Sequence, residues 1–347
     1  MGTKRTTAVS RAAGRAALGI GLAGALAACG SVGGSATSDV GAFEGEDLEL
    51  VVPYEPGGGY DVYARAIAPS LEECLGARVI VLNEPGASGL VATNKTAAAP
   101  ASANRIQIVN TVGLVSAQIA GAEGANFDLS ELSWIGRVSA PPNVLVVAAD
   151  SPVRDFQDIV DAKKTVRFVA QGPGANDYIA PNVVGSAYGY PFKTITGFAG
   201  SSEARTAIVA GNADAHVLPV DSQLPAIKAG DVRPIVTIDE EPDPLLPDTP
   251  TIYKTEPPSD EARSIIDDLV AMGRTGRSLA ASPKMDKERL AALREGFQCA
   301  ADDQALVEEM KEQQRPFNPL GGEETARLVD EVLGASEEFQ KLIRRSY

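Results

Sequence analysis

The chain has 347 residues, 44% of them hydrophobic and 22% charged, which excludes a disordered chain and predicts two domains or one large α/β domain. Its formal net charge is −15, from 31 Lys and Arg against 46 Asp and Glu, so no nucleic-acid partner is expected, since such partners require basic surfaces. One His and three Cys exclude His-rich, Cys₄ and Cys₂His₂ metal sites, and we expect neither a metal nor a cofactor.

The N-terminus is predicted to be a targeting segment. Four basic residues at positions 4, 5, 11 and 15 precede an apolar stretch over 16–28 that is too short to span a bilayer. Leu26-Ala27-Ala28-Cys29 resembles the lipobox of bacterial lipoproteins. We therefore predict a signal peptide over 1–28, lipidation at Cys29 and a flexible tether over 29–44. The mature protein would be extracytoplasmic and anchored by lipid to the cell membrane; an ordinary signal peptide is the alternative.

Removal of residues 1–28 leaves 27 basic and 46 acidic residues, a net charge of −19. Cys74 and Cys299 then remain as an even pair in an oxidising compartment. A disulfide between them and two buried free thiols are both open alternatives. A disulfide that closes so long a loop would contribute roughly 3–5 kcal/mol in the chain-entropy model.

The first part of the chain alternates apolar strands and amphipathic helices. Strands are predicted over 48–52, 78–82 and 105–111, and helices over 62–74 and 90–99. Asp61 is predicted to cap the first of these helices, because its carboxylate can accept from free N–H groups. The alternation favours an α/β fold with a largely parallel sheet.

The same alternation continues further along the chain. Strands are predicted over 144–148, 165–170, 194–198, 215–220 and 233–238, with helices over 153–162, 179–188, 202–210 and 224–229. A Pro-rich segment over 242–258 is predicted to be irregular. The last predicted helices cover 287–300, 303–313 and 323–340.

Two α/β units follow from this order. We predict that residues 45–143 and 233–347 form domain 1 and that residues 144–232 form domain 2. The chain would cross near 140–143 and again near 233–234, where the strand over 233–238 returns toward domain 1. Two domains on a double hinge can close over a ligand.

Three loops share one design, in which a strand is followed by a Gly-rich turn and a helix: 56–61, 171–177 and 199–202. Each helix start offers free N–H donors and a partial positive charge, and glycine lets a ligand approach the backbone. We predict that these loops hold a carboxylate across the cleft without requiring Arg or Lys. The alternative is that each loop is only a tight turn before a capped helix. Neither a Walker motif nor G-x-G-x-x-G is present, which disfavours a nucleotide.

The segment 51–65, VVPYEPGGGYDVYAR, resembles the opening signature of the substrate-binding proteins of tripartite tricarboxylate transporters, also called Bug receptors. Further similar segments are VLNEPGASG at 81–89, PNVLVV at 142–147, GSSEA at 200–204, IKAG at 227–230 and DTPT at 248–251. The resemblance implies a type II-like, two-domain periplasmic-binding-protein fold with a double-strand hinge. It also implies a small ligand, usually a carboxylate, that is held by backbone amides, hydroxyls and bridging waters and is delivered to membrane permease subunits. We expect a di- or tricarboxylate or a related carboxylate as the ligand, and a monomer as the state of the protein.

The resemblance further implies a set of substrate-binding positions. They are Tyr54, Pro56, Gly57, Gly58, Gly59, Tyr60, Asp61, Gly86, Ser88, Thr111, Val112, Gly113, Gly174, Ala175, Asn176, Asp177, Gly200, Ser201, Ser202 and Leu218. Three of them depart from the family pattern. Tyr60 stands where the family commonly has Thr, and Leu218 replaces an acidic residue. Asp177 belongs to an altered helix start and could either cap that helix or contact a ligand amine. These departures bear on the identity of the ligand.

Two other functions are compatible with the sequence. The chain could be a sensor lipoprotein without a transport partner, or an enzyme that uses the same cleft through His216, Asp177 or Asp221. His216 lies inside an apolar strand, which favours a structural histidine. We therefore expect no catalytic residue.

Overall fold

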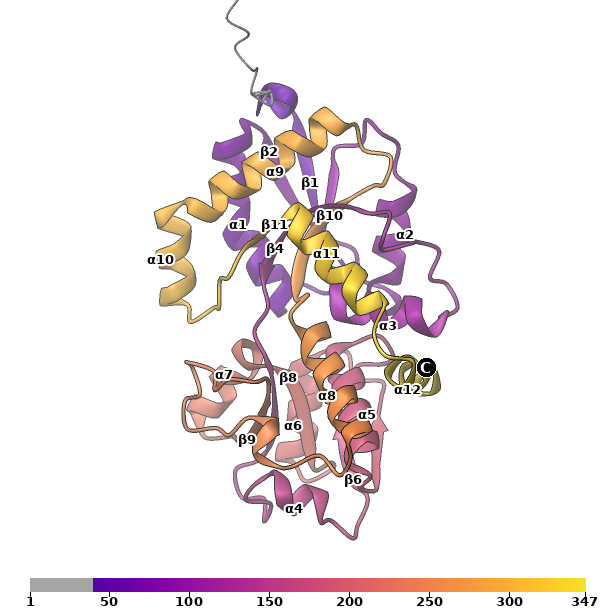
Figure 1. Ribbon diagram of the computed structural model, residues 1–347. Coiled ribbons are helices and arrows are strands. Elements are labelled where there is room, and N and C mark those ends of the chain that lie inside the picture. Colours follow the sequence, from indigo (N-terminus) through magenta and orange to yellow (C-terminus); the bar gives the residue numbers. More distant parts are fainter. Residues whose placement is uncertain (1–39) are drawn as a thin grey trace, which may run out of the picture. The chain divides into compact units, whose positions relative to one another are not determined.

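A computed structural model describes residues 40–347, which form two mixed sheets surrounded by helices (Figure 1). The predicted signal peptide, Cys29 and residues 29–39 of the predicted tether lie outside the described residues. The end of that tether was wrongly predicted. A 3₁₀ helix covers Val40–Phe43, and Phe43 is fully buried in the core beside Leu48.

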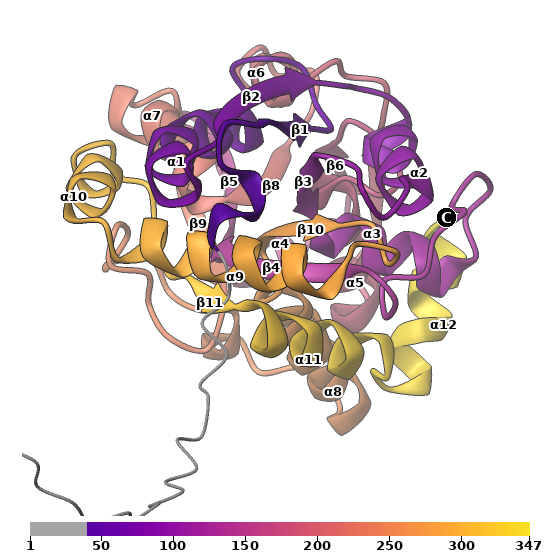
Figure 2. The same ribbon diagram turned by 90° about the horizontal axis from the view of Figure 1, so that it is seen from above.

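The first lobe is built on a six-stranded sheet with the order β11-β4-β10-β3-β1-β2. Its strands are β1 (Asp47–Val52), β2 (Arg78–Asn83), β3 (Arg105–Asn110), β4 (Ser133–Ser139), β10 (Arg277–Ala281) and β11 (Leu320–Gly321). Its helices are α1 (Gly59–Leu75), α2 (Leu90–Ala98), α3 (Thr111–Ala120), α9 (Lys287–Asp302), α10 (Gln304–Glu312) and α11 (Gly322–Leu333). Helices α9 and α11 both pack against β4 (Figure 2).

The second lobe is built on a five-stranded sheet with the order β7-β6-β8-β5-β9. Its strands are β5 (Asn143–Ala148), β6 (Val166–Val169), β7 (Phe192–Ile195), β8 (Ala215–Pro219) and β9 (Val232–Ile238). Its helices are α4 (Phe156–Val160), α5 (Asn176–Tyr188), α6 (Ser201–Val209), α7 (Val220–Ala229) and α8 (Asp260–Gly273). Short 3₁₀ turns cover Ala87–Gly89 in the first lobe and Ile252–Lys254 after β9.

The sheets are mixed, so the prediction of a largely parallel sheet is only half right. In the first sheet, β1, β2 and β3 are parallel, whereas β10 and β4 pair antiparallel. In the second sheet, β7, β6 and β8 are parallel, whereas β5 and β9 pair antiparallel. The reason is the connection between the lobes. Strand β4 runs toward the connection and β10 runs away from it, so the two strands must point in opposite directions.

The return to the first lobe was predicted in the wrong place. Strand β9 does not leave the second lobe near residue 233, because its apolar residues pair with β5 from Asn143↔Ile238 to Ala148↔Val232. The chain instead returns after α8, through Gly276 into β10. Gly276 has φ +54°, and a Cβ there would lie 2.1 Å from the carbonyl oxygen of Ser139. The two connections thus run side by side, which gives the double-strand hinge that the sequence predicts.

The C-terminal helical region is also divided differently from the prediction. Residues 323–340 do not form one helix, because α11 ends at Leu333 and α12 (Glu337–Ser346) begins after Ser336. The hydroxyl of Ser336 accepts from the backbone N–H of Phe339, which starts the new helix. Helix α12 contacts α3 of the first lobe and both α5 and α8 of the second.

A disulfide joins Cys74 of α1 to Cys299 of α9, with a Cα–Cα distance of 6.0 Å, and decides between the two open alternatives for these cysteines. It lies beside the apolar core of the first lobe, which includes Ile67, Leu71 and Phe297. Within residues 40–347, no helix combines the length and hydrophobicity needed to cross a membrane. The same residues contain no cluster of His, Cys, Asp or Glu that could hold a metal ion.

Candidate functional site

A cavity of about 530 Å³ is lined by residues of both lobes. The N-terminal ends of α1, α5, α6 and α7 contribute to its wall. Most of the predicted binding positions line it: Tyr54, Pro56, Gly57, Gly58, Gly59, Tyr60, Gly86, Ser88, Ala175, Asn176, Gly200, Ser201, Ser202 and Leu218. The three Gly-rich loops therefore converge on one space, as the sequence predicts.

The helices that open onto this cavity have no side-chain caps. The N-cap residues of α1, α5, α6 and α7 are Gly58, Ala175, Gly200 and Pro219, and none of them makes a side-chain capping bond within the described residues. Helix α8, by contrast, is capped by a serine hydroxyl. The partial positive charge of four helix starts therefore lies in the same region, and so do N–H groups that no capping side chain occupies, although the first N–H of α7, from Val220, donates to the Pro142 carbonyl. Such an arrangement attracts an anion.

Asp61 is not the N-cap of α1, because the helix already begins at Gly59. The Asp61 carboxylate accepts instead from the Gly57 N–H at 2.9 Å, the Asn83 amide at 2.9 Å and the Arg65 guanidinium at 3.0 Å. Burial raises the pKa of Asp61, but the hydrogen bonds from Arg65, Gly57 and Asn83 together hold it below its usual value. The side chain thus fixes the shape of the Gly-rich loop and does not line the cavity.

Asp177 likewise does not cap its helix. It is fully buried in the first turn of α5 and accepts from the backbone N–H of Gln171 at 3.2 Å. His216 lies 3.4 Å from Asp177, and its other ring nitrogen lies 3.2 Å from the Gln223 amide. Neither Asp177 nor His216 lines the cavity, and the same holds for Asp221, the third residue considered for catalysis. The described contacts of His216 are those of a structural histidine.

Four predicted positions on or near α3 and α5 also lie outside the cavity wall. Thr111 and Val112 are buried in α3. Gly113 and Gly174 lie where α3 meets the loop before α5, and that loop's Gly174 carbonyl accepts from the Asn110 amide at 3.3 Å. These glycines therefore mediate contact between the lobes. Asn110 itself lines the cavity, and its amide donates to the Tyr54 hydroxyl at 2.7 Å.

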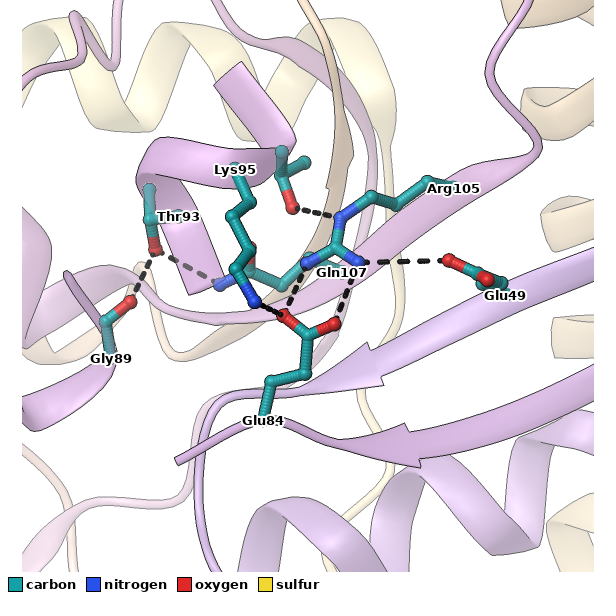
Figure 3. Close-up of polar contacts among 8 residues, drawn as sticks. Glu49, Glu84, Gly89, Thr93, Lys95, Arg105 and Gln107 are labelled. Carbon is teal, nitrogen blue, oxygen red and sulfur yellow. Dashed lines mark hydrogen bonds and ion pairs between the residues drawn. The ribbon is translucent and has the colours of Figure 1, made fainter. Parts of the chain in front are cut away.

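The loop with Gly86 and Ser88 is anchored at its base by Glu84 (Figure 3). The Glu84 carboxylate accepts from two nitrogens of Arg105 at 3.1 and 2.9 Å and from Lys95 at 3.2 Å. The hydrogen bond from Arg105 is the main reason that the pKa of Glu84 lies below its usual value. The far end of the loop is held by Thr93, whose hydroxyl donates to the Gly89 carbonyl (Figure 3).

Several wall residues were not predicted from the sequence. They are Asn110, Phe198, Ser222 and Arg277, together with Pro53, Pro85 and Pro219. Arg277 matters most, because the attraction for an anion was predicted to come from backbone dipoles and not from a cationic side chain. No sequence signal pointed to it, since β10 was not predicted as a strand.

Comparisons with known proteins agree with this architecture. Residues 63–341 match the model of the tripartite tricarboxylate transporter family receptor. A UPF0065 protein from Pseudomonas sp. is 29% identical over 215 residues, which cover 61% of this chain and 63% of that protein. The matched region thus spans about three fifths of the length of the curated relatives.

Two solved structures share the fold. MatC from Rhodopseudomonas palustris with bound malate has a TM-score of 0.71 at 20% identity, covering 86% of this chain and 99% of that one. An R. palustris protein with adipate has a TM-score of 0.72 at 18% identity, covering 86% and 97%. These likenesses confirm the predicted periplasmic-binding-protein fold. Because the family model matches most of the chain, the chain belongs to the receptor family of tripartite tricarboxylate transporters.

Proposed function

We propose that this protein is an extracytoplasmic receptor that captures a small organic anion, a di- or tricarboxylate or a related carboxylate, in the cavity between its lobes. The observation that carries the proposal is the convergence of four helix starts without side-chain caps on one cavity. Its volume of about 530 Å³ lies in the range of small-molecule sites. The structural neighbours described with malate and adipate support the same ligand class.

The hydrogen bonds expected in this cavity supply enough binding free energy for micromolar affinity. Hydrogen bonds to a charged group contribute roughly 1.5–3 kcal/mol each. Four to six such bonds, reduced by an association cost of about 4 kcal/mol or more, reach the roughly −8 kcal/mol of a micromolar complex. Solute-binding receptors are the functional class of the family and the fold, and we assign no catalytic residue.

We further propose that the protein delivers its ligand to permease subunits and that it is a monomer. An acylated Cys29 would anchor it to the membrane. Cys29→Ala should release the protein from the membrane fraction, whereas Cys74→Ser should leave it there. Light scattering of the soluble part should give the mass of one chain. Deletion of the cognate permease genes should abolish uptake of the captured anion while its binding persists.

Calorimetry with ligand-stripped protein tests capture directly. The panel is acetate, succinate, glutarate, adipate, malate and citrate. A ligand at 100 times its dissociation constant should stabilise the fold by about 2.7 kcal/mol. If no member of this panel binds, the proposed ligand class is wrong.

A single substitution tests the role of the helix starts. Gly200 has extended backbone angles and nothing within 4 Å of a Cβ, so Gly200→Asp fits and places a carboxylate as the cap of α6. That carboxylate would compete with the ligand, and affinity should fall without loss of stability. Gly321→Asp is the matched control, since Gly321 is the N-cap of α11, has open space around its Cβ and lies away from the cavity. Equal affinity in both variants would contradict binding by α6.

A further inference from the structure

Arg277, the first residue of β10, lies in the cavity wall although only 3% of it is exposed. Its Nη1 donates to the Ser139 hydroxyl and its Nη2 to a carboxylate oxygen of Asp221, both at 3.3 Å. Its Nε is buried and has no hydrogen-bond partner among residues 40–347. A buried guanidinium is thus only partly satisfied by the side chains described.

The charges around Arg277 do not balance. Asp221 is also the partner of Arg315, whose Nη1 lies 3.1 Å from its other carboxylate oxygen. Within the described part of the chain, neither arginine forms an ion pair with any other carboxylate. Two guanidinium groups therefore share one buried carboxylate, and the cluster keeps one positive charge. An uncompensated charge at a buried site is costly, and an incoming anion would remove that cost.

The neighbouring aromatic rings do not supply the missing negative charge. The Arg277 guanidinium lies 5.3 Å from the ring centre of Tyr60 and 4.7 Å from that of Tyr63. Burial raises the pKa of Tyr60 to about 12, so its phenol is neutral at pH 7. Both rings lie within cation–π distance of the guanidinium and leave its charge in place.

The backbone of Gly59 lies close to Arg277 and Ser222. A Cβ on Gly59 would lie 3.2 Å from Nη2 of Arg277 and 3.3 Å from the Ser222 hydroxyl. Glycine at this position therefore keeps a side chain out of the approach to Arg277 and Ser222, which both line the cavity.

We propose that Arg277 is a specificity-determining residue that binds a carboxylate group of the ligand directly. This inference rests on the proposed function and adds a side-chain cation to the backbone donors. The ligand carboxylate would complete a cluster of two cations and two anions, in which Asp221 comes from α7 of the second lobe and both arginines come from the first lobe. The receptor should then distinguish a carboxylate from its uncharged amide at this end of the cavity.

The experiment compares succinate, glutarate and adipate with their monoamides by calorimetry. In Arg277→Gln, affinity for the diacids should fall about 10- to 100-fold, the range of one lost charge-assisted contact. The preference of the wild type for diacid over monoamide should also disappear, because the introduced side chain is uncharged and can only hydrogen-bond to either group. Arg263→Gln is the control, since it removes the same charge from an exposed ion pair with Glu256 outside the cavity.

Arg277→Lys keeps the test valid if Arg277→Gln does not fold. It should bind diacids more weakly than wild type but retain the preference over monoamides, because the charge remains. Unchanged affinity and preference in Arg277→Gln, or lost preference in Arg277→Lys, would overturn the inference while the proposed function stands. If the wild type binds none of these compounds and no other carboxylate of the panel, both proposals fall together.

Discussion

A Cβ atom on Gly113 would lie 1.9 Å from the carbonyl oxygen of Gly174, so α3 of the first lobe meets the second lobe at a point that accepts no side chain. The Asn110 amide donates to the same oxygen at 3.3 Å, and the Tyr347 hydroxyl donates to the Gly113 carbonyl at 3.3 Å. Both glycines were predicted to bind ligand. Their position instead makes them determinants of how closely the lobes approach.

We predict that Gly113→Ala weakens ligand binding about tenfold or more. Alanine normally favours a helix over glycine by roughly 0.5–1 kcal/mol, but here the added methyl group would force the lobes apart. Calorimetry measures the affinity. Small-angle scattering of the ligand-bound variant should give a larger radius of gyration than that of the ligand-bound wild type. Gly273→Ala is the control, since nothing lies within 4 Å of a Cβ at that position. Equal affinity in the two variants would show that this contact does not control closure.

We predict that Asp61→Asn weakens binding although Asp61 does not line the cavity. The Gly57 N–H and Arg65 both donate to Oδ2 of Asp61, whereas Asn83 donates to Oδ1. An amide has only one acceptor oxygen and would turn its NH₂ group toward one side of this network, so the loop before α1 is held less firmly and stability should fall by about 1–3 kcal/mol. Asp47→Asn, in an exposed pair with Arg78, should change neither quantity. Urea titration and calorimetry measure the two effects.

The pH dependence of this anchor follows from the direction of its shift. Because the folded state lowers the pKa of Asp61, its stabilising effect is present above the unfolded pKa of about 4 and is lost as the pH falls through the folded value. Affinity should therefore be constant between about pH 5 and 8 as far as Asp61 is concerned. If the wild type lost affinity between these pH values and the Asp61→Asn variant did not, this assignment would be contradicted.

The sequence predicted those parts of the fold and site that depend on local pattern. The run Leu48–Val52 is apolar and β-branched, and the three Gly-rich loops are contiguous motifs, so their structures and their place in the cavity could be foreseen. Strand β10 could not, because RSLAA contains small and polar residues without β-branching. Its pairing with β3 and β4 depends on the topology of the whole lobe.

Arg277 was missed for the same physical reason. It lies next to Gly59 and Asp221 only after distant segments have folded together, and no short motif encodes that proximity. The position of β9 shows the opposite error. Its apolar residues were recognised, but an apolar strand fits either sheet, and only pairing with β5 assigns it to the second lobe.

We predict that Cys74→Ser combined with Cys299→Ser lowers the free energy of unfolding by roughly 3–5 kcal/mol. The disulfide joins residues 225 positions apart, and its removal restores conformational freedom to the unfolded chain. Urea denaturation with and without a reductant measures the change. Reductant should destabilise the wild type and leave the double variant unaffected; a variant as stable as the oxidised wild type would refute the estimate.

We predict that His216→Gln leaves ligand affinity within about threefold of wild type. His216 is fully buried, contacts Asp177 and Gln223, and does not line the cavity. The loss should appear in stability, by about 1–3 kcal/mol, since a buried hydrogen-bond network is disturbed. Calorimetry and thermal unfolding separate the two effects. A large loss of affinity at unchanged stability would instead place His216 in the binding machinery.

We predict that the ionisation of two tyrosines lowers the stability of the fold as the pH rises above about 10. Burial raises the pKa of Tyr60 and of Tyr188 to about 12 each, above the unfolded value of about 10. A pKa that is higher in the folded state stabilises the fold fully when the pH lies below the pKa of the unfolded state. This stabilisation is lost as the pH rises through the pKa of the folded state. Tyrosinate absorbance should therefore rise together with loss of circular dichroism. Ionisation of these phenols at about pH 10 in a folded protein would contradict the burial.

The disulfide connects α1 and α9, two helices of the same lobe. No covalent bond between side chains joins the two lobes within the described residues. The covalent reinforcement is thus confined to one lobe. Hinge closure over a ligand would be compatible with an oxidised chain, whereas a bond across the cavity would hold the lobes in one arrangement.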